Sequence, residues 1–409
     1  MEPLKDYDAL QGYMDRLGLF HMDLGLGRME AFWAARGMPG IPVVHVVGTN
    51  GKGSTSTFLC SIARTHGTKA GLFTSPHFVS PRERVQVNRA LLGRDEWVAL
   101  ANEVLTTPGG EALTYFEFQT CLAMLAFEKR NVDMAVMEAG LGGRFDATTV
   151  FSPRLTLFTP IDMDHEKILG PTLVDIARDK AGAIHPGSVA VTGPQRAEAM
   201  IELANRAEAV GARLIPASDV ADPVDGLRLG LSGPHQRDNA RLALAGWRVF
   251  AAMADIRSEA DAEGFGLESA FVPGRLQRVS LGGRTVILDG AHNSHALAAL
   301  GEALKADGIR PASVIFACLA DKDVSAMLPL VRALTDGPVL VPGMDNERAG
   351  DAARIASEMG GAARPAATLA DALSEAFAAR SEAQGPVLIC GSLYLLGEFY
   401  RMHPEFLTK

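Results

Sequence analysis

The stretch from 43 to 55 reads VVHVVGTNGKGST, an apolar run that breaks into a glycine-rich loop with one lysine. The run Val43–Val47 is β-branched apart from His45, which predicts a buried parallel strand. Glycines then allow a tight turn with inward-pointing N–H groups, and an amphipathic segment predicts a helix after it. Together these parts predict a phosphate cradle in which Lys52 neutralises anionic charge. The strict P-loop pattern fails because Gly53, and not Ser or Thr, follows the lysine.

The composition describes an ordinary soluble globular chain. Its 409 residues suffice for two or three domains, with 47% hydrophobic and 21% charged residues. The net charge of −9 argues against a broad nucleic-acid surface. The four cysteines lie far apart in apolar segments, which predicts reduced core thiols and not a zinc site. The sequence contains no signal-peptide core and no run of about 18 apolar residues. We expect a cytoplasmic monomer that binds neither membranes nor nucleic acid.

Strand and helix patterns alternate along the chain, which predicts an α/β fold with parallel sheets. A polar, acidic stretch at 255–270 separates two parts. We expect one α/β domain that contains the phosphate loop over 1–272 and a smaller Rossmann-like α/β domain, without a G-x-G-x-x-G fingerprint, over 273–409. Predicted strands lie at 43–47, 69–73, 133–139, 154–161, 188–192, 227–231, 285–289, 313–318, 338–341 and 386–390. Predicted helices include 116–130 and 235–254.

Polar residues follow the predicted strands of the first part, where open parallel sheets bind their ligands. Ser75 follows the second strand, Glu138 ends the third, and Asp164 with His165 follow the fourth. Hard oxygen ligands suit Mg²⁺ that bridges nucleotide phosphates. Taken alone, His165 would more often be a hydrogen-bonded histidine than a metal ligand. The presence of Asp164 and Glu138 favours the metal site.

These motifs resemble folylpolyglutamate synthase and the bifunctional dihydrofolate synthase of the Mur ligase superfamily. The resemblance covers nearly the whole chain, and the order and spacing of the motifs are specific. It is carried by 48–54, 75–77, Glu138, 140–144 and 164–165, with further matches at 23–26, 115–117, 179–182, 235–239, 273–275, 289–293, 321–323 and 391–392.

The resemblance implies a P-loop-type ATPase domain, Mur-ligase-like and binding ATP and folate, over 1–272 and a glutamate-binding ligase domain over 273–409. It also implies an ATP site and two magnesium ions. The implied ATP contacts are Thr49, Asn50, Gly51, Lys52, Gly53 and Ser54, then Asn239 for adenine, Arg275 for phosphates and Asp289 for ribose. The implied metal ligands are Ser75, Glu138, His165 and a carbamylated Lys180. Carbamylation needs a neutral amine, so we expect a lowered pKa for Lys180, which Asp179 would oppose unless its side chain points elsewhere.

The resemblance also implies the substrates. A pterin or folate is expected at Asp23, Leu24, Thr114, Tyr115, Phe116, Arg144 and Asp146, and L-glutamate at His292, Asn293 and Ser392. ATP would phosphorylate the substrate carboxylate, and the amine of glutamate would attack the acyl phosphate. Lys52, Lys180 and His292 are the expected catalytic residues. For His292, a purely structural role at a strand end stays open.

Several alternatives remain at this point. The enzyme could add the first glutamate to dihydropteroate, later glutamates to reduced folates, or both; we expect both. A peptidoglycan Mur ligase needs a nucleotide-sugar domain before the loop, and only 47 residues precede Gly48. A P-loop regulator would explain the cradle alone, and a metabolite kinase would leave the amine site unused. Thr149 and 21–22 depart from the family pattern, which bears on substrate preference.

Overall fold

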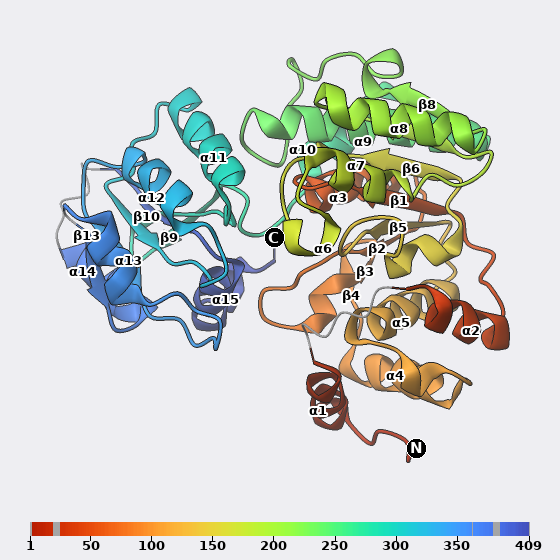
Figure 1. Cartoon of the computed structure of the whole chain (residues 1–409), viewed down its shortest axis with the longest axis horizontal. Helices are drawn as coiled ribbons and strands as arrows, with labels where there is room; N and C mark the ends of the chain where they lie inside the picture. Colours follow the sequence, from red (N-terminus) through yellow and green to blue (C-terminus); the bar gives the residue numbers. More distant parts are fainter. Residues whose placement is uncertain (1, 19–24, 362, 379–384, 409) are drawn as a thin grey trace. The chain divides into compact units, whose positions relative to one another are not determined.

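The computed structural model describes residues 2–18, 25–361, 363–378 and 385–408 (Figure 1). Two predicted site residues, Asp23 and Leu24, therefore lie outside the described residues. The chain divides into two compact units. The first comprises Met1–Leu229 and Asp238–Ala270, and the second comprises Gly230–Arg237 and Phe271–Lys409.

An eight-stranded sheet forms the centre of the first unit, in the order β4-β3-β2-β5-β1-β6-β7-β8. Strands β2, β5, β1, β6, β7 and β8 run parallel, whereas β3 and β4 are antiparallel additions at one edge. All five residues of β1 are buried, because this strand lies between β5 and β6. The strands are β1 Val43–Val47, β2 Ala70–Phe73, β3 Val85–Val87, β4 Ala90–Leu91, β5 Met134–Glu138, β6 Leu155–Phe158, β7 Val189–Thr192 and β8 Arg213–Pro216.

The five strands predicted between 43 and 192 are confirmed, but the strand predicted at 227–231 is wrong. That segment forms bends and coil, and Leu227 is exposed. Its apolar–polar alternation fits a half-buried strand, yet the sheet ends at β8 and offers it no partner.

Helices of the first unit cover both faces of the sheet. Helix α5 is buried at almost every position, because it lies against the sheet and is covered in turn by α4. Helix α3 contacts β1, β2 and β5 and packs on α10. The helices are α1 Tyr7–Leu17, α2 Gly27–Arg36, α3 Lys52–Thr65, α4 Arg94–Thr106, α5 Tyr115–Lys129, α6 Glu166–Leu169, α7 Leu173–Ala181, α8 Ala197–Ala209, α9 His235–Met253 and α10 Ala260–Ser269, with short 3₁₀ helices that include η1 Pro81–Arg84 and η3 Ala147–Phe151.

The second unit has a six-stranded sheet in the order β13-β12-β11-β14-β10-β9. Its strands are parallel except β9, which forms an antiparallel hairpin with β10. The four predicted strands are confirmed, and β9 and β13 are additional. The elements are β9 Gln277–Leu281, β10 Arg284–Leu288, α11 Ser294–Ala306, β11 Ser313–Phe316, α12 Val324–Ala333, β12 Val339–Pro342, α13 Ala352–Met359, β13 Ala363–Ala366, α14 Leu369–Ala378, β14 Val387–Cys390 and α15 Leu393–Met402.

Across the described parts of the chain, no helix combines the length and apolar character needed to span a bilayer.

Candidate active site

The glycine loop follows β1 directly and adopts a backbone that only glycine fits. Gly48 has φ 150°, and a Cβ there would lie 1.9 Å from Thr159 Oγ1. Gly51 has φ 90°, and a Cβ there would lie 2.3 Å from Asn239 Oδ1. A side chain at either position would collide with its neighbour. The close approach at Gly51 also brings Asn239, the predicted adenine contact, beside the predicted phosphate loop.

Thr49 ties this loop to the segment after β6. Its N–H donates to the carbonyl oxygen of Pro160 at 3.0 Å. Its hydroxyl donates to the Asp162 carbonyl and accepts from the Asp162 N–H, both at 3.0 Å. The loop is therefore held by protein contacts before any phosphate arrives, which is the preorganisation that phosphoryl transfer requires.

Lys52 is the first residue of α3, and its ammonium folds over the loop. Nζ donates to the carbonyl oxygens of Gly48 at 3.3 Å and Thr49 at 3.1 Å. The positive end of a 14-residue helix adds to its charge. Ser54 is buried in the first turn of the same helix. The cation, the helix start and the glycine loop thus share one place, as the sequence predicted.

Lys180 reaches the same loop from α7. It is buried, and its Nζ donates to the carbonyl oxygen of Gly48 at 2.9 Å. Burial, followed by the charge of Lys52, lowers the pKa of Lys180 to about 7. Asp179 opposes this shift only in part, because its Oδ1 accepts instead from the Gly143 N–H at 2.9 Å. A substantial share of the Lys180 amine is therefore uncharged at neutral pH.

Glu138 ends β5 beside the first turn of α3. Its side chain is nearly fully buried, and its Oε2 accepts from the Ser75 N–H at 3.0 Å. A Cβ at Gly53 would lie 3.5 Å from Oε2 and 3.7 Å from Oε1. The structure therefore brings Ser75, Glu138 and the helix start together.

This group fits a magnesium site of the kind in which phosphates and water supply most ligands, since Mg²⁺ then needs only one or two protein oxygens. His165 caps the four-residue helix α6, is 49% exposed at its side chain, and lies with Nε2 3.9 Å from Asp164 Oδ2. The described residues contain no group of three or more His, Cys, Asp or Glu side chains that could hold a metal ion by itself. The buried carboxylate of Glu138 beside the helix start carries the fit, and the roles of Ser75 and His165 as ligands stay predictions.

The predicted pterin residues of α5 lie next to the loop after β5. The Phe116 ring covers Gly140, where a Cβ would lie 2.6 Å from its Cζ. Thr114 caps α5, and its N–H donates to Glu117 Oε2 at 2.8 Å. Tyr115 is buried, with its ring 5.6 Å from the guanidinium carbon of Arg84. The N-terminus of α5 is thus fixed by capping and ring contacts.

Arg144 and Asp146 lie on the loop after β5, but they face different surroundings. Arg144 is exposed, and its guanidinium stacks on Phe145 at 4.9 Å. Asp146 is buried: Oδ2 accepts from the Leu141 N–H at 2.9 Å and Oδ1 from the Thr148 N–H at 3.0 Å. Asp146 therefore holds the backbone of this loop.

Two contacts at this loop were not predicted from the sequence. The Thr149 hydroxyl donates to the Gly143 carbonyl at 2.7 Å, so this departure from the family pattern serves the loop backbone. Gly143 packs directly on α7, where a Cβ would lie 2.5 Å from the Lys180 carbonyl oxygen. The glycine pair at 142–143 was the sequence signal for this close approach.

In the second unit, the predicted nucleotide residues Asp289 and Arg275 contact backbone atoms of neighbouring segments. Asp289 is buried, and its oxygens accept from the N–H groups of Leu276 and Ala291, each at 2.9 Å. Burial raises the pKa of Asp289, and the charge of Arg275 opposes that rise. Arg275 lies against Gly290, where a Cβ would be 2.3 Å from its Nη1.

The predicted glutamate residues follow two neighbouring strands, β10 and β14. The Gly391 N–H donates to the Ala291 carbonyl at 2.8 Å, which joins the two strand ends. His292 Nδ1 lies 2.8 Å from the Gly290 carbonyl oxygen. Asn293 and Ser392 are the side-chain N-caps of α11 and α15. These residues therefore follow adjacent strands of the sheet, and their roles toward glutamate stay predictions.

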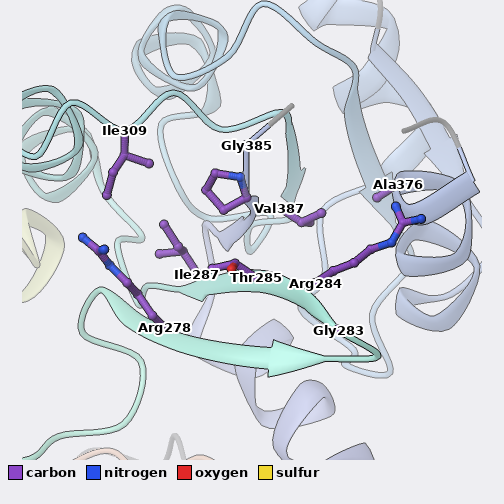
Figure 2. A pocket seen from close by; sticks show the side chains of 10 residues that line it. Arg278, Gly283, Arg284, Thr285, Ile287, Ile309, Ala376, Gly385 and Val387 are labelled. Atoms are coloured by element: carbon purple, nitrogen blue, oxygen red, sulfur yellow. The ribbon is translucent and has the colours of Figure 1, made fainter. Parts of the chain in front are cut away.

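The second unit also has a cavity of about 270 Å³ near the other ends of these strands (Figure 2). Arg278 and Ile309 lie at one side of it and Arg284 and Ala376 at the other. Ile287 and Val387 are among its apolar lining. Of the predicted site residues that the structure describes, none lines this cavity.

Comparison with known proteins connects these features to one family. Residues 274–393 match the family described as Mur ligase, glutamate ligase domain. The chain is 37% identical over 343 residues to the dihydrofolate synthase/folylpolyglutamate synthase of Bacillus subtilis, covering 76% of this chain and 79% of that protein. The chain belongs to the dihydrofolate synthase/folylpolyglutamate synthase family. The Escherichia coli member is 33% identical over 399 residues, covering 93% of this chain and 92% of its own.

Solved structures of the family have the same fold. Escherichia coli FolC in complex with DHPP and ADP has a TM-score of 0.88 and 29% identity, over 99% of each chain. The Yersinia pestis folylpolyglutamate synthase/dihydrofolate synthase complexed with AMPPNP and Mn ion has a TM-score of 0.87 and 26% identity, over 99% of this chain and all of the other. The predicted two-domain α/β fold is confirmed. As a member of this family, the protein is an ATP-dependent ligase of folate metabolism.

Proposed function

We propose that this dihydrofolate synthase/folylpolyglutamate synthase family member adds L-glutamate both to dihydropteroate and to reduced folates such as tetrahydrofolate. The observation that carries the proposal is the constellation around Gly48, whose carbonyl oxygen accepts from both Lys52 and Lys180. Glu138 lies against the first turn of the helix that Lys52 begins. Two amines, a glycine loop and a carboxylate are the parts that phosphoryl transfer to a substrate carboxylate requires.

The reaction begins with transfer of the γ-phosphoryl group of ATP to the substrate carboxylate, which gives an acyl phosphate and ADP. The amine of glutamate then attacks the acyl carbon, the C–O bond to phosphate breaks, and an amide and inorganic phosphate result. Lys52 and the N-terminus of α3 bind the phosphates, and Arg275 adds a second cation. Asn239 and Asp289 are proposed to contact adenine and ribose. Positioning and charge neutralisation provide most of the catalysis.

Magnesium ions would neutralise the phosphate oxygens when bound. Ser75, Glu138 and His165 are the proposed ligands, and Lys180 would join them as a carbamate. In that modification the neutral Nζ attacks the carbon of CO₂, an N–C bond forms, and a proton leaves to solvent. The lowered pKa of Lys180, to about 7, supports the first step because it leaves the amine uncharged near neutral pH.

The substrates are proposed to bind where the family resemblance puts them. Thr114, Tyr115, Phe116 and Arg144 would hold the pterin, together with Asp23 and Leu24. Asp146 would act through the loop that its carboxylate holds, since both of its oxygens accept from backbone N–H groups. L-glutamate would bind at His292, Asn293 and Ser392. A monomeric state and a cytoplasmic location belong to the same proposal, and sedimentation of the purified chain tests the first.

Product analysis tests the proposal. Purified protein is incubated with ATP, Mg²⁺ and glutamate, with either dihydropteroate or tetrahydrofolate, and products are identified by mass spectrometry. We expect each substrate to gain glutamyl residues. Over multiple turnovers, ADP should form only when glutamate is present. If tetrahydrofolate is extended and saturating dihydropteroate is left untouched, the protein is a folylpolyglutamate synthase only.

A further inference from the structure

His45 lies in the middle of β1, and the proposed function gives it no role. Its side chain is fully buried, with Nε2 2.7 Å from Thr148 Oγ1. Burial, and then the nearby His185, lowers the pKa of His45 to about 3. The ring is therefore neutral at physiological pH, with one N–H donor and one acceptor nitrogen. Burying an imidazole in an otherwise β-branched strand costs free energy that its hydrogen bonds must offset.

The neighbours of His45 determine which of its nitrogens carries the proton. Asp146 accepts from the Leu141 and Thr148 N–H groups, and the Thr148 hydroxyl also donates to Asp146 Oδ1. Because that hydroxyl proton points at the carboxylate, Thr148 Oγ1 can only accept from His45. The proton of His45 therefore sits on Nε2. His45 Nδ1 is buried without a hydrogen-bond partner among the residues that the structure describes.

We propose that His45 is a positioning residue that anchors the loop 140–146 through Thr148 and Asp146. The inference rests on the proposed function, because it takes this loop as part of the pterin side of the site. His45 lies three residues before Gly48, where the phosphate loop begins, and aligns with Met137 of β5 in the sheet. The hydrogen-bond relay from His45 through Thr148 to Asp146 thus fixes the loop after β5 relative to the strand that carries the phosphate loop.

The anchored loop contacts two other parts of the site. Gly140 lies under the Phe116 ring, and Gly143 packs on the Lys180 backbone. The Arg144 N–H donates to the Asp179 carbonyl at 2.9 Å. Replacing His45 removes the donor that holds the Thr148 hydroxyl in place toward Asp146. Replacing Thr148 removes that hydroxyl itself, so Asp146 loses a donor. In both cases we expect the loop to loosen beneath Phe116.

Loss of the relay should change the phosphate loop much less, because the hydrogen bonds that hold that loop do not involve the relay. Thr49 is held by Pro160 and Asp162, and Gly48 accepts from Lys180. We therefore expect a difference between the two substrates: the KM for the pterin substrate rises, and the KM for ATP does not.

Four variants test this relay by steady-state kinetics with dihydropteroate and with tetrahydrofolate. His45→Leu and Thr148→Val should each raise the KM for the pterin substrate by about tenfold, the effect of one lost buried hydrogen bond. His45→Gln keeps an N–H donor near the position of Nε2 and should stay within about threefold of the wild type. The matched control is Thr156→Val, because Thr156 is aligned with His45 on β6, equally buried, and donates to Ala183.

Combining His45→Leu with Thr148→Val should raise the KM for the pterin substrate little beyond either single variant, since both remove the same relay. The inference is overturned if the KM for ATP rises as much as that for the pterin substrate, if Thr156→Val gives the same increase, or if His45→Gln behaves as His45→Leu does. If the wild type itself makes no product from either pterin substrate, the proposed function has failed, which is a distinguishable outcome.

A measurement on the unmodified protein does not depend on whether the variants fold. Nitrogen-15 NMR of the histidine rings should find His45 neutral, with its proton on Nε2, from pH 6 to 8. A proton on Nδ1, or a charged ring in this range, would overturn the relay.

Discussion

Lys52 and Lys180 donate to one acceptor, the carbonyl oxygen of Gly48, although they come from different helices. Two like charges this close favour loss of a proton from the more buried amine. Burial, and then the charge of Lys52, lowers the pKa of Lys180 to about 7, whereas Lys52 lies at a helix start that faces the loop. This difference supports the proposal that Lys180 is the amine that reacts with CO₂.

The first prediction at the residue scale concerns Lys52. Lys52→Ala should reduce turnover at least about a thousandfold, because the loop loses the cation that stabilises the transferring phosphoryl group. The measurement is ADP formation at saturating ATP. Lys305→Ala, an exposed lysine at the end of α11, is the control and should keep wild-type turnover. Near-normal turnover in Lys52→Ala would contradict the nucleotide-site assignment.

A second prediction concerns the carbamate on Lys180. Lys180→Ala should be inactive and should regain part of its activity when a short carboxylic acid is added, since the acid can replace the missing carboxylate. Lys167→Ala, an exposed lysine on the neighbouring helix α6, should need no such rescue. An inactive Lys180→Ala enzyme that no carboxylic acid restores would count against the carbamate.

The pH dependence of this activation follows from the direction of the pKa shift. Since the folded-state pKa of Lys180 is lowered to about 7, the amine is uncharged above that pH and protonated below it. Only the uncharged amine attacks CO₂. Protein preincubated with bicarbonate at pH 8 should therefore start faster than protein preincubated at pH 6, when both are diluted into one assay buffer. Equal initial rates would contradict this prediction.

At the scale of elements, the loop after β5 links several parts of the site. It touches α7 through Gly143 and Phe116 of α5 through Gly140. The sequence predicted β5, Glu138 and the glycine-rich segment, because a buried strand and its polar end leave clear patterns. It could not predict that the carboxylates of Asp146 and Asp289 would accept from backbone N–H groups, since those contacts depend on tertiary placement.

The missed strands have a similar explanation. Strands β3, β4 and β8 are short or lie at an edge of the first sheet, and β9 and β13 are the edges of the second. Edge strands carry mixed burial and therefore weak periodicity. The core strands β1 and β5 are buried at every position and were predicted directly.

The close packing of Gly143 on α7 predicts the effect of a substitution on stability. Gly143→Ala should destabilise the protein by about 1–3 kcal/mol, because its Cβ would meet the backbone of Lys180 and neither helix nor loop can easily shift. Gly264→Ala is the matched control, since that glycine lies inside α10 with open space around it, and it should stabilise by about 0.5–1 kcal/mol. Denaturant unfolding measures both. A neutral Gly143→Ala would show that the loop does not pack on α7 as described.

In the whole molecule, one compact unit carries the proposed ATP site, and the other contains the residues that match the family described as Mur ligase, glutamate ligase domain. The motifs of both units were recognisable in the sequence because they follow strand ends in order. Substrate choice was not recognisable in the sequence, because Thr149, which departs from the family pattern, donates to the backbone of its own loop, a contact that depends on tertiary placement.

The central claim is that the protein activates a pterin carboxylate as an acyl phosphate and couples it to glutamate. The most direct test uses dihydropteroate with both carboxylate oxygens labelled with ¹⁸O, together with ATP, Mg²⁺ and glutamate. We predict that one labelled oxygen leaves in the inorganic phosphate and the other stays in the new amide. Unlabelled phosphate, or ADP formation that leaves dihydropteroate unchanged, would contradict the account.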